Sequence, residues 1–478
     1  MTLFLSLLIV LLLLLAAGAV LLVRAIRFVP PPREPASAED LQVDTDRAVQ
    51  HLQAMIRCRT ISQAELRDEA EFEKFRALLP EFYPRLFARA SVERVDSTGV
   101  LIHLTGREPG APAVLLGHYD VVPVNQEAWE KPAFAGILED GVLWGRGTLD
   151  MKNQLCCMLE GIETLLAQGF TPRHDLWFAL SGEEEIMGPS AASMRDVLKN
   201  AGIRPAFVLD EGGDIMDGVF PGTDVPCAMV GIGEKGSANL YFTASGAGGH
   251  SSTPFYGNPL SDLCKAMTIM EKHPWPVRPG SALNKMVDTM GRYCSFRTRL
   301  LLANRDILRP LYHRWIVRQH GMIEAGARTT WALTQARGSA AGNVIPPEAE
   351  MFVNVRVMHG DTHEKVIDRA RKYIGADIRI HEHVNGSEAC PDSLMTAGWT
   401  ELKAAIEATW PEAVVTPYQM VAGTDSRHWR EICDNVYRFS GKQVTNEEKS
   451  TVHGNNERIR TVNTENAIKF FIRLLEQC

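Results

Sequence analysis

The sequence predicts an α/β protein in which a doubly wound layer is interrupted by an inserted α+β segment. From residue 46 to about residue 233, short apolar runs alternate with helical patterns, which is typical of a sheet with helices on both faces. Residues 238–245 and 351–357 instead alternate between apolar and polar side chains, as strands with one exposed face do. We therefore expect a smaller unit inserted within a larger one.

Three apolar runs in the first part of the chain predict buried strands. They cover residues 113–117, 176–180 and 205–209. Helical patterns lie between and after them, at residues 151–167 and 190–200. Ligand sites in open α/β sheets form beyond the carboxyl ends of the strands, so the residues that follow these runs are candidates for a functional site.

Acidic and histidine residues follow all three runs. His118 and Asp120 follow the first run, the glutamate triplet 183–185 follows the second, and Asp210 and Glu211 follow the third. Taken singly, each motif would most simply be a surface turn or the start of an exposed helix. Independent surface motifs have no reason to share this placement, so their joint occurrence favours one common site.

These residues, together with Asp150 and His453, supply enough imidazole and carboxylate to bind two metal ions. Zinc takes histidine nitrogen and carboxylate oxygen, and two ions held roughly 3.5–4 Å apart need a bridging ligand. His118 and His453 could give one nitrogen to each ion, and Asp150 could bridge them. One acid of the triplet could bind metal while its neighbour acts as a base, and an acid after the third run could complete the second ion.

Eight short stretches carry a resemblance to a known family. They are GHYDVVP (117–123), WGRGTLDMK (144–152), GEEE (182–185), LDEGG (209–213), GHSS (249–252), GNVIP (342–346), GTDSR (423–427) and HG (453–454). With them the chain resembles the carboxypeptidase S and aminoacylase group of co-catalytic zinc peptidases, nearest to its N-fatty-acyl-amino-acid hydrolase/synthase branch. The resemblance implies a zinc-exopeptidase-like catalytic domain, an inserted lid domain, and two Zn²⁺ ions per subunit, with other divalent ions as substitutes.

The resemblance also implies a role for each matching position. The metal ligands would be His118, Asp150 as the bridge, Glu185, His453 and one of Asp210 and Glu211. Glu184 would be the general base, and Asp120 would orient the ring of His118, as carboxylates commonly do for metal-bound imidazole. Where the family often has Asp and Thr, this chain has Glu183 and Tyr119, and both changes keep the coordinating groups.

With this set of residues, the resemblance implies hydrolysis of an amide bond. The ions would activate water and stabilise the oxyanion, and Glu184 would carry the proton to the leaving amine. His250 resembles a lid histidine that reaches the oxyanion, often across a homodimer formed through the lid; otherwise it is an ordinary loop histidine. Arg427 resembles an arginine that holds a substrate carboxylate in a bidentate pair, and Asn343 would also contact substrate.

Length, composition and charge restrict the class of protein. At 478 residues the chain is long enough for two domains, and 45% hydrophobic and 23% charged residues are globular values. A net charge of −8, without basic runs interleaved with aromatic residues, argues against nucleic acid as a partner. The nine cysteines lack the paired spacing of a zinc knuckle, and their odd number leaves at least one thiol unpaired in a monomer.

The first 23 residues contain no charged side chain and are mostly Leu, Val and Ala. A span of ~20 such residues matches a bilayer core, and no basic residue precedes it as in a signal peptide. We expect an uncleaved transmembrane anchor, with a cleaved signal and a secreted protein as the alternative. Residues 24–45, which include three consecutive prolines, predict a stiff tether.

Two indications disagree about the side of the membrane. Arg24, Arg27 and Arg33 follow the apolar span, and the positive-inside rule would then place the body in the cytoplasm. The resemblance points the other way, because relatives with such a leader are secreted or face a lumen. We expect an extracytoplasmic body.

The expected domains are a catalytic unit at residues 46–233 and 386–478 and a lid at 234–385, with glycine-rich sequence at 231–236 as the hinge. Helical sequence between residues 260 and 331 resembles an insertion in the carboxypeptidase S branch. Its bulky apolar side chains would line an acyl pocket or, more simply, form core. They are Met267, Met270, Leu300, Leu301, Leu302 and Trp315.

The sequence thus predicts a metal-dependent hydrolase of N-acyl-amino acids or short peptides with a free C-terminal carboxylate. A carboxypeptidase proper, or a deacetylase or esterase on the same scaffold, is the alternative. A membrane-tethered binding protein is the non-enzymatic alternative, but binding alone would not require a base such as Glu184. A single-zinc enzyme of another fold is disfavoured because the sequence lacks His-Glu-x-x-His.

Overall fold

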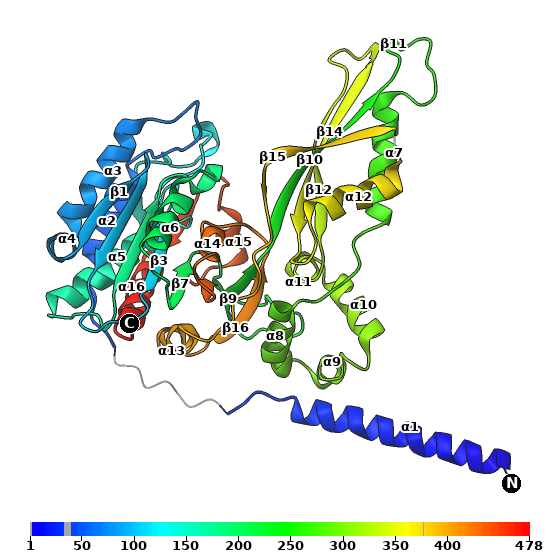
Figure 1. Cartoon of the computed structure of the whole chain (residues 1–478), viewed down its shortest axis with the longest axis horizontal. Helices are drawn as coiled ribbons and strands as arrows, with labels where there is room; N and C mark the ends of the chain where they lie inside the picture. Colours follow the sequence, from blue (N-terminus) through cyan, green and yellow to red (C-terminus); the bar gives the residue numbers. More distant parts are fainter. Residues whose placement is uncertain (1, 33–39, 376) are drawn as a thin grey trace.

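The computed structural model describes residues 2–32, 40–375 and 377–478, and the chain forms two parts with a helix extending from one end (Figure 1). The larger part is built on a nine-stranded sheet and the smaller part, the lid, on a four-stranded sheet. This arrangement has the α/β layer and the inserted α+β unit that the sequence predicts.

The three predicted strands are neighbours in the middle of the large sheet. In spatial order its strands are β1 (Ser91–Val95), β2 (Gly99–Leu104), β6 (Leu176–Ser181), β3 (Ala113–His118), β7 (Phe207–Asp210), β17 (Val436–Arg438), β9 (Cys227–Glu234) and β16 (Val414–Met420), with β8 (Ile215–Met216) paired to β9. β3 runs parallel to β6 on one side and to β7 on the other. The carboxyl ends of these three strands, with their polar residues, therefore lie side by side.

Helices cover both faces of this sheet. One face packs against α2 (Thr45–Ile56), α3 (Glu69–Phe82), α4 (Pro84–Arg89), α5 (Lys152–Ala167), α13 (Trp399–Thr409) and α16 (Thr461–Leu475), and the other against α6 (Ser190–Asn200) and α14 (Ser426–Trp429). Within β3, Leu115 joins the first core while Val114 and Leu116 join the second, because successive side chains point to opposite faces. Each such fully buried side chain contributes roughly 1.5–3 kcal/mol, so the strand that carries the site is held from both sides.

The lid sheet has one buried face. Its order is β12 (Thr330–Arg337), β14 (Glu348–Val357), β10 (Gly236–Ser245) and β15 (Ile378–Ser387), and α7 (Pro259–Lys272) and α12 (His363–Ile374) pack against it. Every second side chain of β14 is buried, which matches the alternation read from the sequence. A two-stranded antiparallel sheet of β11 (Gly249–His250) and β13 (Val344–Ile345) lies at the tip of the lid, far from β3 and β7 (Figure 1).

The glycine-rich segment that the sequence suggested as a hinge is mostly strand. Gly231 and Gly233 lie inside β9, and β10 begins at Gly236, so Lys235 alone separates the two sheets. The Lys235 side chain is buried, and its Nζ donates to the backbone oxygens of Ala325 and Arg328. The connection between the two parts is therefore held by specific contacts.

Four helices of the insertion belong structurally to the larger part. They are α8 (Ser281–Met290), α9 (Phe296–Leu302), α10 (Arg309–Gln319) and α11 (Gly321–Ala325), with the short η3 (Gly291–Tyr293) after α8. Leu283, Met286 and Met290 of α8 are buried in the core of the larger part and not in that of the lid. The insertion thus contributes to both parts.

Five of the six residues considered for an acyl pocket are divided between these two cores. Met267 and Met270 are buried in the lid core, whereas Leu302 is buried in the core of the larger part, where Leu301 and Trp315 pack against it. Side chains in two separate cores do not line one pocket, so the structure favours the simpler interpretation as core.

A small three-stranded sheet joins distant parts of the sequence. It consists of β18 (Arg458–Arg460), β5 (Val142–Trp144) and β4 (Ile137–Glu139), and β18 pairs antiparallel with β5. This pairing lays the loop before β18 against the turn after β5. Residues 453–457 therefore lie beside residues 145–150, which brings His453 to Asp150.

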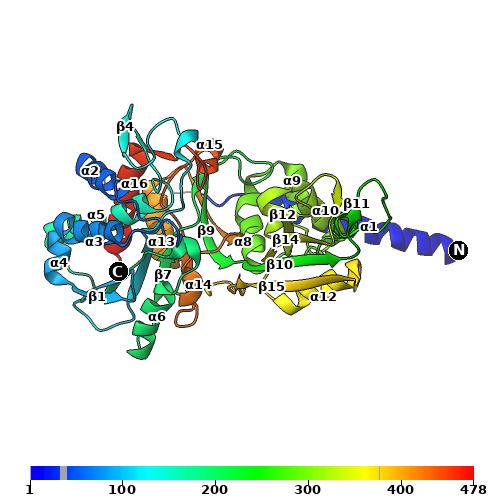
Figure 2. The same cartoon turned by 90° about the horizontal axis from the view of Figure 1, so that it is seen from above.

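The N-terminal segment forms one long helix, α1 (Thr2–Arg27), which projects from the body (Figures 1 and 2). Among the described residues, Leu3–Arg27 is the one helix long and apolar enough to cross a membrane, and a signal sequence would satisfy the same test. The end of this helix contacts the body, since Ala25 and the following Phe28 are buried. The predicted tether falls partly on residues 33–39, which lie outside the described residues.

Candidate active site

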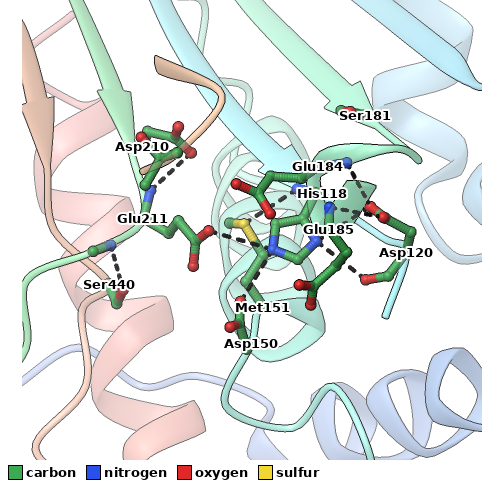
Figure 3. Close-up of polar contacts among 12 residues, drawn as sticks. His118, Asp120, Asp150, Met151, Ser181, Glu184, Glu185, Asp210, Glu211 and Ser440 are labelled. Carbon is green, nitrogen blue, oxygen red and sulfur yellow. Dashed lines mark hydrogen bonds and ion pairs between the residues drawn. The ribbon is translucent and has the colours of Figure 1, made fainter. Parts of the chain in front are cut away.

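His118 is the last residue of β3, and its ring is 2% exposed. Its Nε2 lies 3.0 Å from Oδ1 of Asp150 and 3.3 Å from Oε1 of Glu211 (Figure 3). Its Nδ1 lies 3.1 Å from the backbone oxygen of Asp120. A proton on Nδ1 donated to Asp120 leaves Nε2 free to act as a ligand on the side of the carboxylates.

Asp150 lies between the two histidines. Its Oδ1 is 3.0 Å from Nε2 of His118, and its Oδ2 is 3.1 Å from Nε2 of His453. It stands just before α5, in the turn that β5 and β18 hold in place. One carboxylate oxygen facing each imidazole is the placement that a ligand shared by two cations needs.

Glu185 lies on the His453 side of this cluster. Its Oε2 is 3.1 Å from Nε2 of His453, the same nitrogen that faces Asp150. His453 has a φ of 59°, in the left-handed region that costs a residue with a Cβ roughly 1 kcal/mol or more. The loop thus holds His453 in an unfavourable backbone conformation that aims its ring at the carboxylates.

Asp120 supports the glutamate triplet as well as His118. It is fully buried, its Oδ1 accepts the backbone N–H of Glu184, and its Oδ2 accepts that of Glu185, both at 3.1 Å (Figure 3). A carboxylate that accepts two consecutive backbone N–H groups fixes the start of the short η2 (Glu184–Ile186). Asp120 therefore connects the strand that carries His118 to the segment that carries Glu184 and Glu185.

The structure separates Asp210 from Glu211, which the sequence left as alternatives. The Glu211 carboxylate faces His118 at 3.3 Å. The Asp210 carboxylate turns away and accepts backbone N–H groups from Glu211 and Ser426, each at 2.8 Å. Glu211 thus faces the cluster with its carboxylate, whereas Asp210 positions the segment that begins α14.

Glu184 and Glu183 occupy different surroundings although they are adjacent. A Glu184 oxygen lies within 4.8 Å of ligand atoms of His118 and Glu211, and across the described residues no other side chain donates a hydrogen bond to it. Glu183 points elsewhere, since its Oε1 accepts hydrogen bonds from Arg67 at 2.9 Å and Ser97 at 3.1 Å. Glu184 is therefore the carboxylate of the triplet that stays unpaired beside the cluster.

Burial and the charges of neighbouring carboxylates shift the pKa values of the acidic residues in the cluster. Burial raises the pKa of Glu185 to about 7 and that of Glu211 to about 7, with the charge of Asp150 adding to both. Burial also raises the pKa of Glu184 well above its usual value. The pKa of Asp150 is instead lowered well below its usual value, since hydrogen bonds from His118 and His453 outweigh its burial. Carboxylates gathered this closely need positive charge among them.

The residues that are present fit divalent cations. One ligand atom from each of His118, Asp150 and Glu185 lies within 4.8 Å of the others, and the same holds for His118, Glu184 and Glu211. Histidine nitrogen and carboxylate oxygen are the donors that zinc takes at catalytic sites, and cations would relieve the repulsion among these acids. Asp150 lies in the middle of this set, with His118 on one side and His453 on the other.

Sequence reasoning missed Glu457, which holds the two loops of the site together. Its fully buried carboxylate accepts the backbone N–H groups of Gly147, Leu149 and Asp150 at 3.0, 2.7 and 3.1 Å. It also pairs with Arg146 at 2.6 Å, and Arg146 donates to the backbone oxygen of Gly454 at 2.7 Å. Arg146 lies close to Asp150 in the sequence, and Glu457 lies close to His453. These two charged residues were the available signal, because their buried ion pair holds both loops together.

Two predicted substrate contacts lie away from this cluster. His250 is exposed on β11 at the tip of the lid, where its Nδ1 contacts the Ser252 hydroxyl at 2.7 Å. Asn343 lies beside it, since its backbone oxygen accepts the N–H of Ser251 at 3.0 Å. Both views place this tip far from β7, the strand that precedes Glu211 (Figures 1 and 2). Within one chain, the fold does not bring these two residues to the site.

Arg427 lies closer to the cluster, on α14. Its Nη1 donates to the backbone oxygen of Thr424 at 2.9 Å, and within the described residues its other side-chain N–H groups make no hydrogen bond. Burial raises the pKa of Asp425 to about 6, while the charges of Arg427 and His118 both oppose this rise. The guanidinium therefore shares the electrostatic environment of the ligand cluster and keeps donors for a further anion.

Comparison with known proteins identifies the group to which this arrangement is related. Residues 114–477 match the model of Peptidase family M20/M25/M40. The chain is 31% identical over 416 residues to N-fatty-acyl-amino acid synthase/hydrolase PM20D1 of Homo sapiens, covering 85% of this chain and 82% of that protein. It is 32% identical over 418 residues to probable carboxypeptidase S-like 2 of Dictyostelium discoideum, covering 85% and 80%.

Solved structures share the fold at lower identity. The M20 family metallo-carboxypeptidase Sso-CP2 from Sulfolobus solfataricus gives a TM-score of 0.65 at 16% identity, covering 90% of this chain and 98% of that one. Human carnosine dipeptidase 1 gives 0.61 at 15% identity, covering 91% and 96%. The predicted fold class and family resemblance are confirmed.

Proposed function

The chain belongs to peptidase family M20/M25/M40 and is a metal-dependent hydrolase of that family, and we propose that it cleaves the amide bond of N-acyl-amino acids with a free carboxylate. The placement of Asp150 between His118 and His453, at 3.0 and 3.1 Å, is the observation that carries the proposal. Relatives named as N-fatty-acyl-amino acid synthase/hydrolases support this substrate class, and short peptides are the alternative because other relatives are named carboxypeptidase S-like.

Two Zn²⁺ ions would occupy the cluster. His118 and Glu211 would hold one ion, His453 and Glu185 the other, and Asp150 would be shared, as the contacts of these side chains support. When bound, the ions supply Lewis acidity and a water of lowered pKa. Asp120 keeps the His118 ring oriented, and its hydrogen bonds to the Glu184 and Glu185 backbone hold both glutamates in place.

Glu184 is the general base in this proposal. It is beside the cluster and unpaired, so it can take a proton from the attacking water and pass it to the leaving amine.

His250 and Asn343 would act from a second copy of the chain. Both lie at the exposed lid tip, with His250 on β11 and Asn343 just before β13, and cannot serve the site of their own chain from there. A homodimer formed through the lid would bring His250 of one copy to the oxyanion in the other, as the family resemblance implies. The proposed role of His250 therefore requires the proposed dimer.

Arg427 would bind the free carboxylate of the substrate. Replacing Arg427 with alanine is expected to raise KM roughly ten- to a hundredfold for substrates with a free carboxylate, because a charge-assisted pair is worth about 1.5–3 kcal/mol. Steady-state kinetics of the zinc-loaded enzyme on a panel of long-chain N-acyl-amino acids, dipeptides and their methyl esters measures this. The panel also decides between the acyl-amino-acid and peptide alternatives.

The matched control is Arg430→Ala. Arg430 is an arginine of the same segment that donates to Cys433 and Asp434. It should leave KM unchanged for both acid and ester substrates. Equal losses on acids and on methyl esters in Arg427→Ala would contradict the carboxylate contact, and no turnover of any panel member would contradict the proposed substrate class.

α1 would anchor the enzyme to a membrane. Leu3–Arg27 is long and apolar enough to span a bilayer, and Ala25 in its last turn and Phe28 just after it are buried against the body. We place the body on the extracytoplasmic side, as the resemblance favours, with secretion as the result if the leader is cleaved.

A further inference from the structure

The segment from η3 to the end of α10 is strongly basic in an acidic protein. Residues 291–320 contain one acidic residue, Asp306, in a chain whose net charge is −8. The arginines of this segment are Arg292, Arg297, Arg299, Arg305, Arg309, Arg314 and Arg318. Arg297, Arg309, Arg314 and Arg318 are exposed, and we call these four residues, with the apolar side chains described next, the basic face.

Large apolar side chains are exposed within the same segment. Phe296 is 42% exposed, Ile307 is 54% exposed and Leu311 is 51% exposed. Apolar side chains interspersed with arginine are the composition of surfaces that lie in the headgroup region of a bilayer, where the ring or aliphatic group enters and the guanidinium stays with phosphate.

The segment that carries the basic face lies next to the end of the apolar helix. Asn304 donates from Nδ2 to the backbone oxygen of Leu21 at 3.0 Å, and Asp306 pairs with Arg24 at 2.9 Å. The Arg292 guanidinium lies 4.7 Å from the centre of the Phe28 ring. These contacts place the loop between α9 and α10 beside the last turn of the apolar span, where a bilayer crossed by α1 would have its headgroups.

Asp306, the only acidic residue of the segment, is paired and so does not repel an anionic partner. Asp306 is neutralised by Arg24, so the four exposed arginines are left without local compensation from their own segment. α8, directly before the segment, is buried in the core of the larger part through Leu283 and Met286. The segment therefore continues directly from a helix of this core, so binding through the basic face would orient the larger part relative to its partner.

We propose that the basic face binds the anionic phospholipid headgroups of the membrane that carries α1. This rests on the proposed anchoring, not on the side of the membrane, and requires anionic lipid in the leaflet that faces the body: α1 tethers the protein, and the basic face lays the body against that leaflet. Each arginine near an anionic surface strengthens binding about fivefold, and the attraction falls off within a Debye length. Long-chain N-acyl-amino acids, being amphiphiles, gather at the same surface.

The test uses the full chain in lipid nanodiscs, either of phosphatidylcholine alone or of about three parts phosphatidylcholine to one part phosphatidylglycerol. Hydrogen–deuterium exchange is followed in peptides from residues 296–318 and, for reference, from the lid. The expected result is exchange slowed at least about fivefold in the basic face in anionic discs, with lid exchange unchanged and the protection lost in high salt.

Two variants of equal charge change complete the design. Arg297→Glu, Arg309→Glu, Arg314→Glu and Arg318→Glu together should abolish the protection. Arg337→Glu, Lys365→Glu, Arg371→Glu and Lys372→Glu together change exposed residues of the lid and should retain it. Far-ultraviolet circular dichroism and turnover of a soluble dipeptide check that both are folded.

Three outcomes would overturn the proposal. They are equal exchange in neutral and anionic discs, equal protection by free inorganic phosphate, and loss of protection in the lid variant as well. Protection that appears only when an acidic protein is added would assign the face to a protein partner instead. Exchange is measured without substrate, so a failure here is distinct from a failure of the proposed hydrolysis.

Discussion

Replacing Glu184 by glutamine is expected to lower kcat at least about a hundredfold while leaving the metal content of the protein unchanged. Glutamine keeps the size of the side chain and can still accept a hydrogen bond, but it cannot take a proton from water. Glu184 has no side-chain donor among the described residues, so its loss breaks no hydrogen bond that holds the fold. The measurement is kcat, with metal content by mass spectrometry on the same sample.

The neighbouring glutamate provides the control. Glu183 pairs with Arg67 at 2.9 Å and accepts from Ser97 at 3.1 Å, away from the cluster. Glu183→Gln should therefore lower the thermal stability more than the turnover of the folded enzyme. If Glu184→Gln turns over at the wild-type rate, or if it loses its metal, Glu184 is not the base.

Replacing Asp150 by asparagine should eliminate turnover and weaken both metal sites. Its two oxygens face His118 and His453 separately, and an amide can offer only one weakly basic oxygen. Removing the shared negative charge also leaves the two cations to repel each other without a ligand between them. The expected result is activity at background and less than two ions per chain after dialysis.

Asp140→Asn is the control for this variant. Asp140 is an exposed residue in the turn between β4 and β5, with a φ of 49° that asparagine also adopts readily. It should keep two ions and full turnover. If Asp150→Asn binds two ions as tightly as the wild type, the carboxylate is not shared and the assignment of the cluster is wrong.

The parts of the site that lie at strand ends were predictable from local sequence. Each apolar run predicted a buried strand, and the parallel arrangement of β6, β3 and β7 brings the ends of these strands together. The predicted run at 113–117 ends one residue early, since β3 includes His118. The apolar runs and the polar residues that follow them were sufficient to predict this part of the site, because both the sequence signal and the strand ends are local.

The choice between Asp210 and Glu211 could not be read from the sequence. They are consecutive and both are acidic, and which carboxylate faces the site depends on how β7 ends beside β3. Glu457 was missed for a related reason. Its partner Arg146 is 311 positions away, and only the pairing of β18 with β5 makes them neighbours.

The packing partner of the helical insertion was equally hidden. An amphipathic pattern shows that one face of α8 is buried but not which core receives it, and the predicted range 234–385 treats the insertion as lid. The core clusters place Met286 with the large sheet and Met270 with the lid sheet. Tertiary contacts, not periodicity, make this distinction.

The most direct test of the account is the metal content of the purified wild-type protein, measured together with its turnover before and after chelation. We propose that a pair of divalent cations is bound by His118, Asp150, Glu185, Glu211 and His453. We expect two ions per chain, loss of turnover when the ions are removed, and recovery of turnover when zinc is restored. Active protein without bound divalent ions, or turnover that survives chelation, would contradict it.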